Sequence, residues 1–345
     1  MIELQPEKDF SQAADRQVDV SVIVVSFNTK DLLERCLKSI RQSAGGMAIE
    51  TIVIDNASVD GSADLVSEQF PDIVLVRNAH NRGFGAAVNQ GLRIATGEFI
   101  LLLNSDALLM NDSLTGLTSY LKANLAVGLT SCRLVDASGA TQPSASDLPN
   151  LWMQVASFYG LKRLVPSWTM RRLLNSGIGA AIVRRLSAGH IIPQANVSGP
   201  VEVEFLSGAC LMMRRQVWEG IGDFDENIFL YLEDADWCRR AVQHGWRLAY
   251  LPQPVVVHRG GESFKALTGG HKSRVSLERC RSLLYYFRKH ETASQLFLLK
   301  AVIVSSMLAR LFGLGFRRLL GGINRVDGAR KSTLYMGIIK QAVRG

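Results

Sequence analysis

Short apolar runs alternate with amphipathic segments through the first hundred residues of this 345-residue chain. Continuous β-branched or leucine-rich runs are typical of strands buried on both faces, and apolar positions three or four residues apart are typical of helices. We expect strands at residues 20–25, 51–54, 73–76 and 99–103, with helices at 30–42, 61–70 and 85–95 between them. This alternation predicts an α/β fold with a parallel, doubly wound sheet, whose ligands bind beyond the carboxyl ends of its strands.

The pattern loosens after about residue 140 and becomes helical towards the end of the chain. The later expected elements are a strand pair within 202–214, a helix at 234–243, strands at 247–251 and 255–257, and helices from 276 onward. We divide the chain into an N-terminal extension (1–19), a main α/β domain (20–262) with a helical or loop insertion (141–200), and a basic helical C-terminal region (263–345).

Positive charge is concentrated in the C-terminal region. The formal net charge is +8, and residues 262–345 alone carry 16 Lys and Arg against 4 Asp and Glu. Such charge beside apolar residues indicates an anionic membrane surface or a phosphorylated acceptor as partner. No nucleic-acid-binding motif and no aromatic interleaving accompany it, so we do not expect nucleic acid as a partner.

The cysteines and the N-terminal segment indicate a cytoplasmic protein. The five cysteines are scattered without a C-x-x-C pair, which fits a reducing compartment and argues against a disulfide framework or a zinc site. The first nineteen residues are polar and lack the apolar run of a secretory signal.

Residues 296–316 form an apolar stretch long enough to cross a membrane. Lys300 and Arg310 interrupt it, and a charge deep in a span costs on the order of 3 kcal/mol. Helical projection gathers the polar positions into one arc: Lys300, Ser306, Arg310, Arg317 and Arg318. We expect a basic amphipathic helix lying on the inner face of the cell membrane. The alternative is a core helix, or a dimer helix that would make the protein a homo-oligomer.

Polar residues gather directly after each of the first four expected strands. One such cluster would mean little, because Asp, Asn, Ser and Gly are ordinary turn and cap residues. Four clusters at one edge of a sheet predict a polar platform for a ligand. The platform contains Ser26, Asn28, Asp55, Arg82, Gly83, Asn104 and Asp106.

Six segments occur in the order known from one enzyme family: SVIVVSFNTKDLLERCLKSI, TIVIDNASVDGS, NAHNRGFGAAVNQGL, GEFILLLNSDA, FLSGACLMMRR and FDENIFLYLEDADWCRRAVQHGWRLAYLP, followed by His258. Over about residues 20–262 the chain resembles family 2 glycosyltransferases, and within them the bacterial rhamnosyltransferase-like branch. The resemblance implies the GT-A fold, a Rossmann-like and mostly parallel sheet with flanking helices. To this fold the chain would add a helical insertion and C-terminal amphipathic helices.

The resemblance also implies a nucleotide-sugar site. Asp55 would hydrogen-bond the base, with Ser26 and Asn28 near the base and ribose. Arg82 and Gly83 would lie close to the donor, where a planar guanidinium suits a diphosphate.

A divalent cation, Mg²⁺ or Mn²⁺, is the cofactor that the resemblance implies. Asp106 would bind the cation as it bridges the diphosphate oxygens, and His258 would complete the metal site. The usual family signature at this place is Asp-x-Asp, whereas this chain has Asn104-Ser105-Asp106. Weaker or conditional metal dependence is therefore expected, and oxygen ligands with phosphate suit hard cations.

A second acidic cluster, Glu233-Asp234-Ala235-Asp236, is expected to supply the catalytic base. A carboxylate must take the proton from the attacking hydroxyl. The resemblance places that base here, and we assign it to Asp234, with Glu233 as the alternative. Attraction to the positive end of a helix fully explains Asp236 but explains the other two less well. Gly208 would shape the acceptor pocket, and Trp237 is expected in the core.

The expected activity is inverting transfer of a sugar from a nucleotide diphosphate to a hydroxyl of a glycan or a polyprenyl-diphosphate-linked acceptor. The resemblance favours L-rhamnose from dTDP-rhamnose as donor, and UDP-sugars are the next alternative. A nucleotide-sugar-binding protein without turnover stays open because of Asn104. A dinucleotide-dependent oxidoreductase is disfavoured, since no G-x-G-x-x-G follows the first strand.

Overall fold

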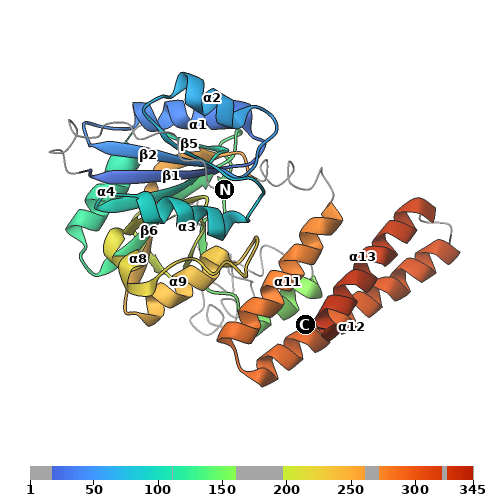
Figure 1. The fold of residues 1–345 in the computed structure, drawn as a ribbon. Helices are drawn as coiled ribbons and strands as arrows, with labels where there is room; N and C mark the ends of the chain where they lie inside the picture. Colours follow the sequence, from blue (N-terminus) through green and yellow to red (C-terminus); the bar gives the residue numbers. More distant parts are fainter. Residues whose placement is uncertain (1–17, 111, 161–196, 261–271, 321–324, 345) are drawn as a thin grey trace. The chain divides into compact units, whose positions relative to one another are not determined.

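The computed structural model describes residues 18–110, 112–160, 197–260, 272–320 and 325–344. These residues include a ten-stranded sheet (Figure 1). Nearly all of the expected N-terminal extension, most of the insertion and the start of the C-terminal region lie outside the described residues. The chain divides into two units. The sheet unit comprises Met1–Asp147, Ile192–Phe229 and Glu233–Gly270, and the helical unit comprises Leu148–Ile191, Leu230–Leu232 and His271–Gly345.

The sheet has the strand order β3-β2-β1-β4-β11-β6-β12-β5, with β7 paired to β6 and β9 to β12. Its strands are β1 (Val20–Ser26), β2 (Ile49–Asp55), β3 (Val74–Arg77), β4 (Phe99–Asn104), β5 (Ala107–Leu109), β6 (Val127–Val135), β7 (Thr141–Gln142), β9 (Val201–Val203), β11 (Cys210–Arg214) and β12 (Arg247–His258). Strands β1 to β4 are parallel, whereas β11 runs antiparallel to β4 and β6. A separate antiparallel pair consists of β8 (Ala145–Ser146) and β10 (Phe205–Leu206).

Helices cover both faces of this sheet (Figure 1). One face carries α1 (Lys30–Gln42), α2 (Ser62–Gln69) and α4 (Ser113–Ala123), and the other carries α3 (Phe84–Ile94), α8 (Arg215–Ile221) and α9 (Glu233–Gln243). Alternate residues of β1 pack against the helices on opposite faces of the sheet. Val22 and Val24 pack in the core with α1, while Ile23 contacts α3 so closely that a Cβ on Gly91 would lie 2.6 Å from it. The expected α/β fold with a mostly parallel sheet and flanking helices is confirmed.

Most expected elements occur within one or two residues of their predicted bounds, and α1 has the bounds predicted. Two expectations were wrong. The strand pair within 202–214 is three short strands, β9, β10 and β11, which pair with different partners. The two strands expected at 247–251 and 255–257 are one strand, β12, whose register shifts between Leu251 and Val255.

The helical unit contains four described helices: α5 (Leu151–Phe158), α11 (Lys272–His290), α12 (Ala293–Leu319) and α13 (Arg325–Arg344). A capping box starts α12, in which Thr292 Oγ1 accepts from the backbone N–H of Gln295 and the Gln295 side chain accepts from the N–H of Thr292. The buried residues of α12 all lie on one side of the helix: Leu299, Ile303, Ser306 and Met307. By length and composition, α12 is the one described helix that could cross a membrane, with a mean hydropathy of 1.8 over an 18-residue window.

Candidate functional site

Parallel pairing places the polar ends of the first strands side by side. Ser26 at the end of β1 is in register with Asp55 at the end of β2, and Val25 is in register with Asn104 at the end of β4. Asp55 is also in register with Arg77 of β3. The expected polar platform therefore lies along one edge of the sheet.

Ser26 and Asn28 hold the loops of this edge together. The Ser26 hydroxyl lies 3.2 Å from that of Thr29, which in turn donates to Ser105 Oγ at 2.9 Å. Asn28 adopts a left-handed backbone (φ 52°) and accepts through Oδ1 from the N–H of Val59 at 2.7 Å. Ser26 is fully buried and Asn28 is half-buried. These hydrogen bonds thus connect the loops that form the platform.

Asp55 is buried at the end of β2, with 3% of its surface exposed. Its Oδ2 accepts from the backbone N–H of Ser58 at 3.0 Å, while Oδ1 has no hydrogen-bond partner among the described residues. Burial raises the pKa of the Asp55 carboxyl, opposed by the hydrogen bonds from Ser58. A buried acceptor without a donor is costly, so Oδ1 is suited to an N–H of a bound ligand.

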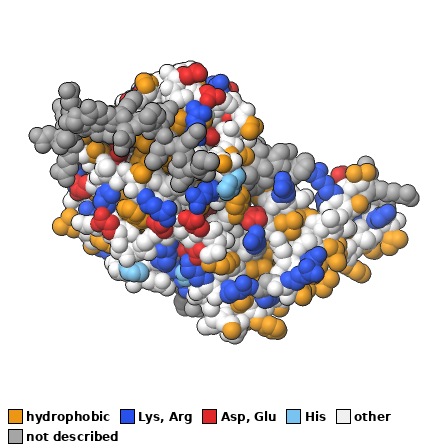
Figure 2. All heavy atoms as spheres, viewed as in Figure 1, with side chains coloured by type: hydrophobic (Ala, Val, Ile, Leu, Met, Phe, Trp, Pro, Cys, Tyr) orange, Lys and Arg blue, Asp and Glu red, His pale blue; other side chains and the backbone are white. Residues whose placement is uncertain are grey.

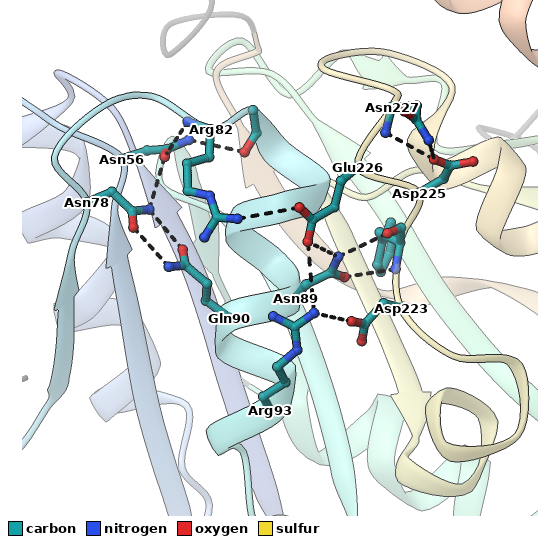
Figure 3. A network of polar contacts seen from close by, with 12 residues as sticks. Asn56, Asn78, Arg82, Asn89, Gln90, Arg93, Asp223, Asp225, Glu226 and Asn227 are labelled. Carbon is teal, nitrogen blue, oxygen red and sulfur yellow. Dashed lines mark hydrogen bonds and ion pairs between the residues drawn. The ribbon is translucent and has the colours of Figure 1, made fainter. Parts of the chain in front are cut away.

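Arg82 is held by a network of amide and carboxylate side chains (Figure 3). Its backbone N–H donates to Asn56 Oδ1 at 3.0 Å, and its guanidinium forms an ion pair with Glu226 at 3.4 Å. Asn56 Oδ1 also accepts from Asn78, whose amide pairs reciprocally with that of Gln90, at 2.9 Å in both directions. Arg82 is about one third exposed, so its guanidinium can reach an incoming anion.

Gly83 has a backbone conformation (φ 88°) that disfavours side chains, and it lies against the backbone of Phe229. A Cβ at this position would lie 2.7 Å from the Phe229 carbonyl oxygen. The same oxygen accepts from the N–H of Phe84 at 3.1 Å. The glycine therefore lets the start of α3 approach the 225–229 loop.

Asp106 and His258 come together because β5 pairs antiparallel with the end of β12, with Ala107 opposite His258. His258 Nε2 lies 3.3 Å from Asp106 Oδ1 and 3.4 Å from Asn104 Nδ2. The Asp106 side chain is 2% exposed and that of His258 is 12% exposed. Asp106 and His258, which were expected to share a metal site, thus lie together, with Asn104 beside them.

The cluster has a donor set suited to a hard divalent cation. Two ligands at about 2.1 Å from an octahedral cation stand about 3 Å apart, close to the Asp106–His258 separation. The described part of the chain contains no group of three or more His, Cys, Asp or Glu that could hold a metal ion by itself. A cation held here would take its remaining ligands from phosphate and water, as Mg²⁺ usually does.

Glu233 and Asp234 begin α9 and differ in exposure. Glu233 is 7% exposed and its Oε2 has no hydrogen-bond partner among the described residues. Burial, with the nearby charge of Asp234, raises the pKa of Glu233 well above its usual value. Asp234 is half-buried, and burial raises its pKa to about 6 although the N–H groups of Gly208 and Ala235 donate to it.

Gly208 connects Asp234 to the platform. Its N–H donates to Asp234 Oδ2 at 3.1 Å, and the carbonyl of the next residue, Ala209, accepts from the N–H of Asn104 at 3.0 Å. A Cβ at Gly208 would lie 3.4 Å from the Phe84 ring. The second acidic cluster therefore lies next to the end of β4.

The residues assigned to structural roles are structural. Asp236 is fully buried and pairs with Arg240 at 3.0 Å, one turn along the helix. Trp237 is buried and stacks on Phe224 with ring centroids 5.0 Å apart, as expected of a core residue. All five cysteines are buried and free.

Several contributing residues carried no recognisable signal in the sequence. Asn89 Nδ2 donates to Glu226 Oε1 at 3.1 Å, linking α3 to the loop that pairs with Arg82. Gln142 contacts His258 from a segment expected to be insertion. These partners lie more than one hundred residues apart in the chain, so spacing could not have paired them.

Comparisons with known proteins identify the family of this chain. The model of glycosyl transferase family 2 matches residues 21–221. The chain is 26% identical over 269 residues to an N-acetylglucosaminyl-diphospho-decaprenol L-rhamnosyltransferase of Mycobacterium tuberculosis, covering 73% of this chain and 81% of that one. It is 27% identical to a pre-mycofactocin glycosyltransferase of the same species, covering 70% of this chain and 42% of that one.

Solved glycosyltransferases share the fold. A mannosyltransferase of Pyrobaculum calidifontis, solved with GDP-Man and Mn²⁺, matches with a TM-score of 0.52 and 20% identity, covering 96% of this chain and 87% of that one. GalNAc-T7, solved with UDP, GalNAc and Mn²⁺, matches with a TM-score of 0.50 and 14% identity over 71% of this chain and 44% of that one. The fold, the family model and the relatives agree: the chain belongs to glycosyl transferase family 2 and is a rhamnosyltransferase-like glycosyltransferase of the GT-A fold.

Proposed function

We propose that the protein transfers L-rhamnose, with inversion, from dTDP-rhamnose to a hydroxyl of a polyprenyl-diphosphate-linked glycan during cell-surface polysaccharide synthesis. The observation that carries the proposal is the Asp106–His258 pair, 3.3 Å apart at the sheet edge that also presents Asp55. The relative that matches over 269 residues is named as a rhamnosyltransferase acting on a decaprenyl-diphosphate sugar, which favours this donor and acceptor. A UDP-sugar is the alternative donor.

The donor half of the site would bind the nucleotide diphosphate. Asp55 Oδ1, which has no hydrogen-bond partner among the described residues, accepts from the base, and Ser26 and Asn28 support the loops around it. Arg82 exchanges its ion pair with Glu226 for the diphosphate oxygens. Gly83 supports the donor half indirectly, because it lets the start of α3 pack against Phe229 next to Arg82.

Asp106 and His258 would hold Mg²⁺ or Mn²⁺, with Asn104 beside them. The bound cation neutralises negative charge that grows on the departing nucleoside diphosphate. Because the protein supplies two ligands in this proposal, we expect the cation to bind much more tightly with the donor than alone.

The acceptor half would contain Asp234 and Gly208. Asp234 takes the proton from the acceptor hydroxyl as the oxygen attacks the anomeric carbon from the face opposite the diphosphate. The N–H groups of Gly208 and Ala235 donate to Asp234 Oδ2 at 3.1 Å and Oδ1 at 2.9 Å, and so fix the orientation of the carboxylate. No protein nucleophile takes part, so the anomeric configuration inverts.

The helical unit would bind the cytoplasmic face of an anionic membrane. The unburied side of α12 carries large apolar side chains, among them Phe297 (71% exposed), Phe312 (80%) and Leu319 (85%). The exposed cations Arg317, Arg318, Arg330 and Lys331 lie on the same two helices, α12 and α13. Hydrophobic and Lys or Arg side chains intermingle on the face seen in Figure 2. Apolar area with basic residues matches the surface of an anionic bilayer.

The test is a transfer assay with purified protein, a panel of nucleotide sugars, Mn²⁺ and a polyprenyl-diphosphate N-acetylglucosamine. We expect the largest turnover with dTDP-rhamnose and, by NMR, a product of inverted anomeric configuration. Donor binding without transfer from any member of the panel would favour the binding protein without turnover. Transfer from a UDP-sugar alone would replace the proposed donor.

A further inference from the structure

Gln142 contacts His258 through both ends of its amide. Gln142 Nε2 donates to the backbone carbonyl of His258 at 2.9 Å, and Gln142 Oε1 lies 2.9 Å from His258 Nδ1. The sheet brings the two residues together across 116 positions, because β7 pairs with β6 at Leu134 and β6 pairs with β12 at Val256. The amide is therefore fixed at two points against one histidine.

These two contacts determine where the ring of a neutral His258 carries its proton. A backbone carbonyl can only accept, so the amide nitrogen of Gln142 must face it and the amide oxygen must face Nδ1. An amide oxygen also only accepts, so Nδ1 must carry the hydrogen. In a neutral imidazole the lone pair is then on Nε2.

The Nε2 atom is the ring atom that faces the cluster at the sheet edge. It lies 3.3 Å from Asp106 Oδ1 and 3.4 Å from Asn104 Nδ2. An amide N–H of Asn104 can donate to the Nε2 lone pair, whereas an aspartate at position 104 could not. The arrangement presents a lone pair at the place where the proposed cation would bind.

We propose that Gln142 is a positioning residue that locks His258 in the Nδ1–H tautomer and thereby presents Nε2 as a metal ligand. The inference rests on the metal site of the proposed function. A partner on the second nitrogen commonly fixes the tautomer and orientation of a metal-binding histidine. Here the partner is a neutral amide, so it orients the ring without adding negative charge beside Asp106.

The rival explanation is that Gln142 only fastens the end of β12 through the His258 carbonyl. The variants Gln142→Glu and Gln142→Leu separate the two roles. A carboxylate still accepts from Nδ1–H but cannot donate to the carbonyl, whereas leucine does neither. Thr141→Val is the matched control, since the neighbouring residue on β7 points to the other face of the strand.

The primary measurement is the tautomer of His258, read from ¹⁵N chemical shifts and long-range couplings of ¹⁵N-histidine-labelled protein without metal, at a pH well above the usual histidine pKa. His258→Gln assigns the signal. We expect the Nδ1–H tautomer in the unmodified protein, in Thr141→Val and in Gln142→Glu, and loss of that preference in Gln142→Leu. An Nε2–H tautomer in the unmodified protein would overturn the proposal, as would an unchanged tautomer in Gln142→Leu.

The second measurement is Mn²⁺ affinity in the presence of dTDP, from the EPR signal of free Mn²⁺. We expect Gln142→Leu to weaken Mn²⁺ binding by roughly 10- to 100-fold, while Gln142→Glu and Thr141→Val are not weakened. Equal affinity in all four proteins would overturn the positioning role. If His258→Gln leaves Mn²⁺ affinity unchanged, the proposed metal site fails although the tautomer result stands. If Gln142→Leu does not fold, the tautomer of His258 in the unmodified protein still tests the proposal.

Discussion

Glu233 and Asp234 are neighbours in sequence, but they differ in exposure. Glu233 is 7% exposed, and burial together with the charge of Asp234 raises its pKa well above the usual value, which disfavours its ionised form. Asp234 is half-buried with a pKa of about 6, so it is ionised at neutral pH. Only an ionised carboxylate can take a proton, which favours Asp234 over Glu233 as the base.

Amide substitutions test this assignment with a matched pair. Asp234→Asn removes the proposed base and should lower kcat by roughly 10²- to 10⁴-fold while donor affinity stays within about threefold. Glu233→Gln leaves the proposed base in place and should keep kcat within about tenfold. Steady-state kinetics and donor titration measure both. The reverse pattern would make Glu233 the base.

The pH dependence of kcat/KM follows from the same pKa. Because the base must be deprotonated, activity should be constant above the pKa of Asp234, about 6, and fall tenfold per pH unit below it. Glu233→Gln should keep this acid limb, since Asp234 is the proposed base. A limb near the usual aspartate value of 3.8 would show that burial does not tune Asp234.

Alanine substitutions at Gly83 and Gly139 distinguish the cost of a steric clash from the cost of backbone strain. Both have positive φ (88° and 84°), but a Cβ at Gly83 would meet the Phe229 oxygen at 2.7 Å, whereas nothing lies within 4 Å at Gly139. Gly139→Ala should cost about 1–2 kcal/mol of unfolding free energy through strain alone. Gly83→Ala should cost about 1–3 kcal/mol more and weaken donor binding. Denaturant unfolding measures the difference, and equal costs would refute the close approach.

Among the helices, α12 exposes its apolar side and buries part of its polar arc. Its buried side contains Leu299 and Ile303, two of the few apolar residues in the arc that also contains Lys300 and Arg310. Arg310 donates to the carbonyl of Phe158 at 2.7 Å, so part of that arc packs on α5 within the helical unit. The apolar side is consequently left at the surface, as the membrane proposal requires.

Replacing Phe312 and Phe316 together by serine tests that surface. The side chains are 80% and 57% exposed, so the free energy of unfolding should change little. Binding to phosphatidylglycerol vesicles should fall at least tenfold, because each buried aromatic contributes about 1.5–3 kcal/mol. Vesicle sedimentation measures this, with Val59→Ser (91% exposed, in the sheet unit) as control. Unchanged sedimentation, or a dimer that these substitutions dissociate, would contradict membrane binding.

The sequence predicted elements well where local pattern decides them. The apolar spacing of Leu33, Leu37 and Ile40 places all three in the core, and α1 has the predicted bounds. The sequence-based prediction was wrong where strand pairing defines the elements. The segment that contains β9, β10 and β11 has the pattern of one strand pair, although the three strands have different partners. Likewise, β12 reads as two strands because its register shift falls between two apolar runs.

At the scale of the whole molecule, the positions of the site residues were predictable and their partners were not. Every candidate before residue 107 ends a parallel strand or lies in the loop after one, so the sheet topology brings these residues towards one edge. The contacts of Arg82 with Glu226 and of His258 with Gln142 depend on loops brought together only by the finished fold. The division into units also departs from sequence order, since Leu230–Leu232 groups with the helical unit and Glu233 with the sheet unit.

Asp55, Asp106 and His258 are proposed to serve one nucleotide-sugar site. A crystal structure with dTDP and Mn²⁺, in which anomalous scattering locates the metal, would test this proposal. We expect Mn²⁺ at Asp106 Oδ1 and His258 Nε2, next to the diphosphate, with the base donating to Asp55 Oδ1. Mn²⁺ bound away from Asp106, or dTDP bound away from the carboxyl edge of the sheet, would contradict it.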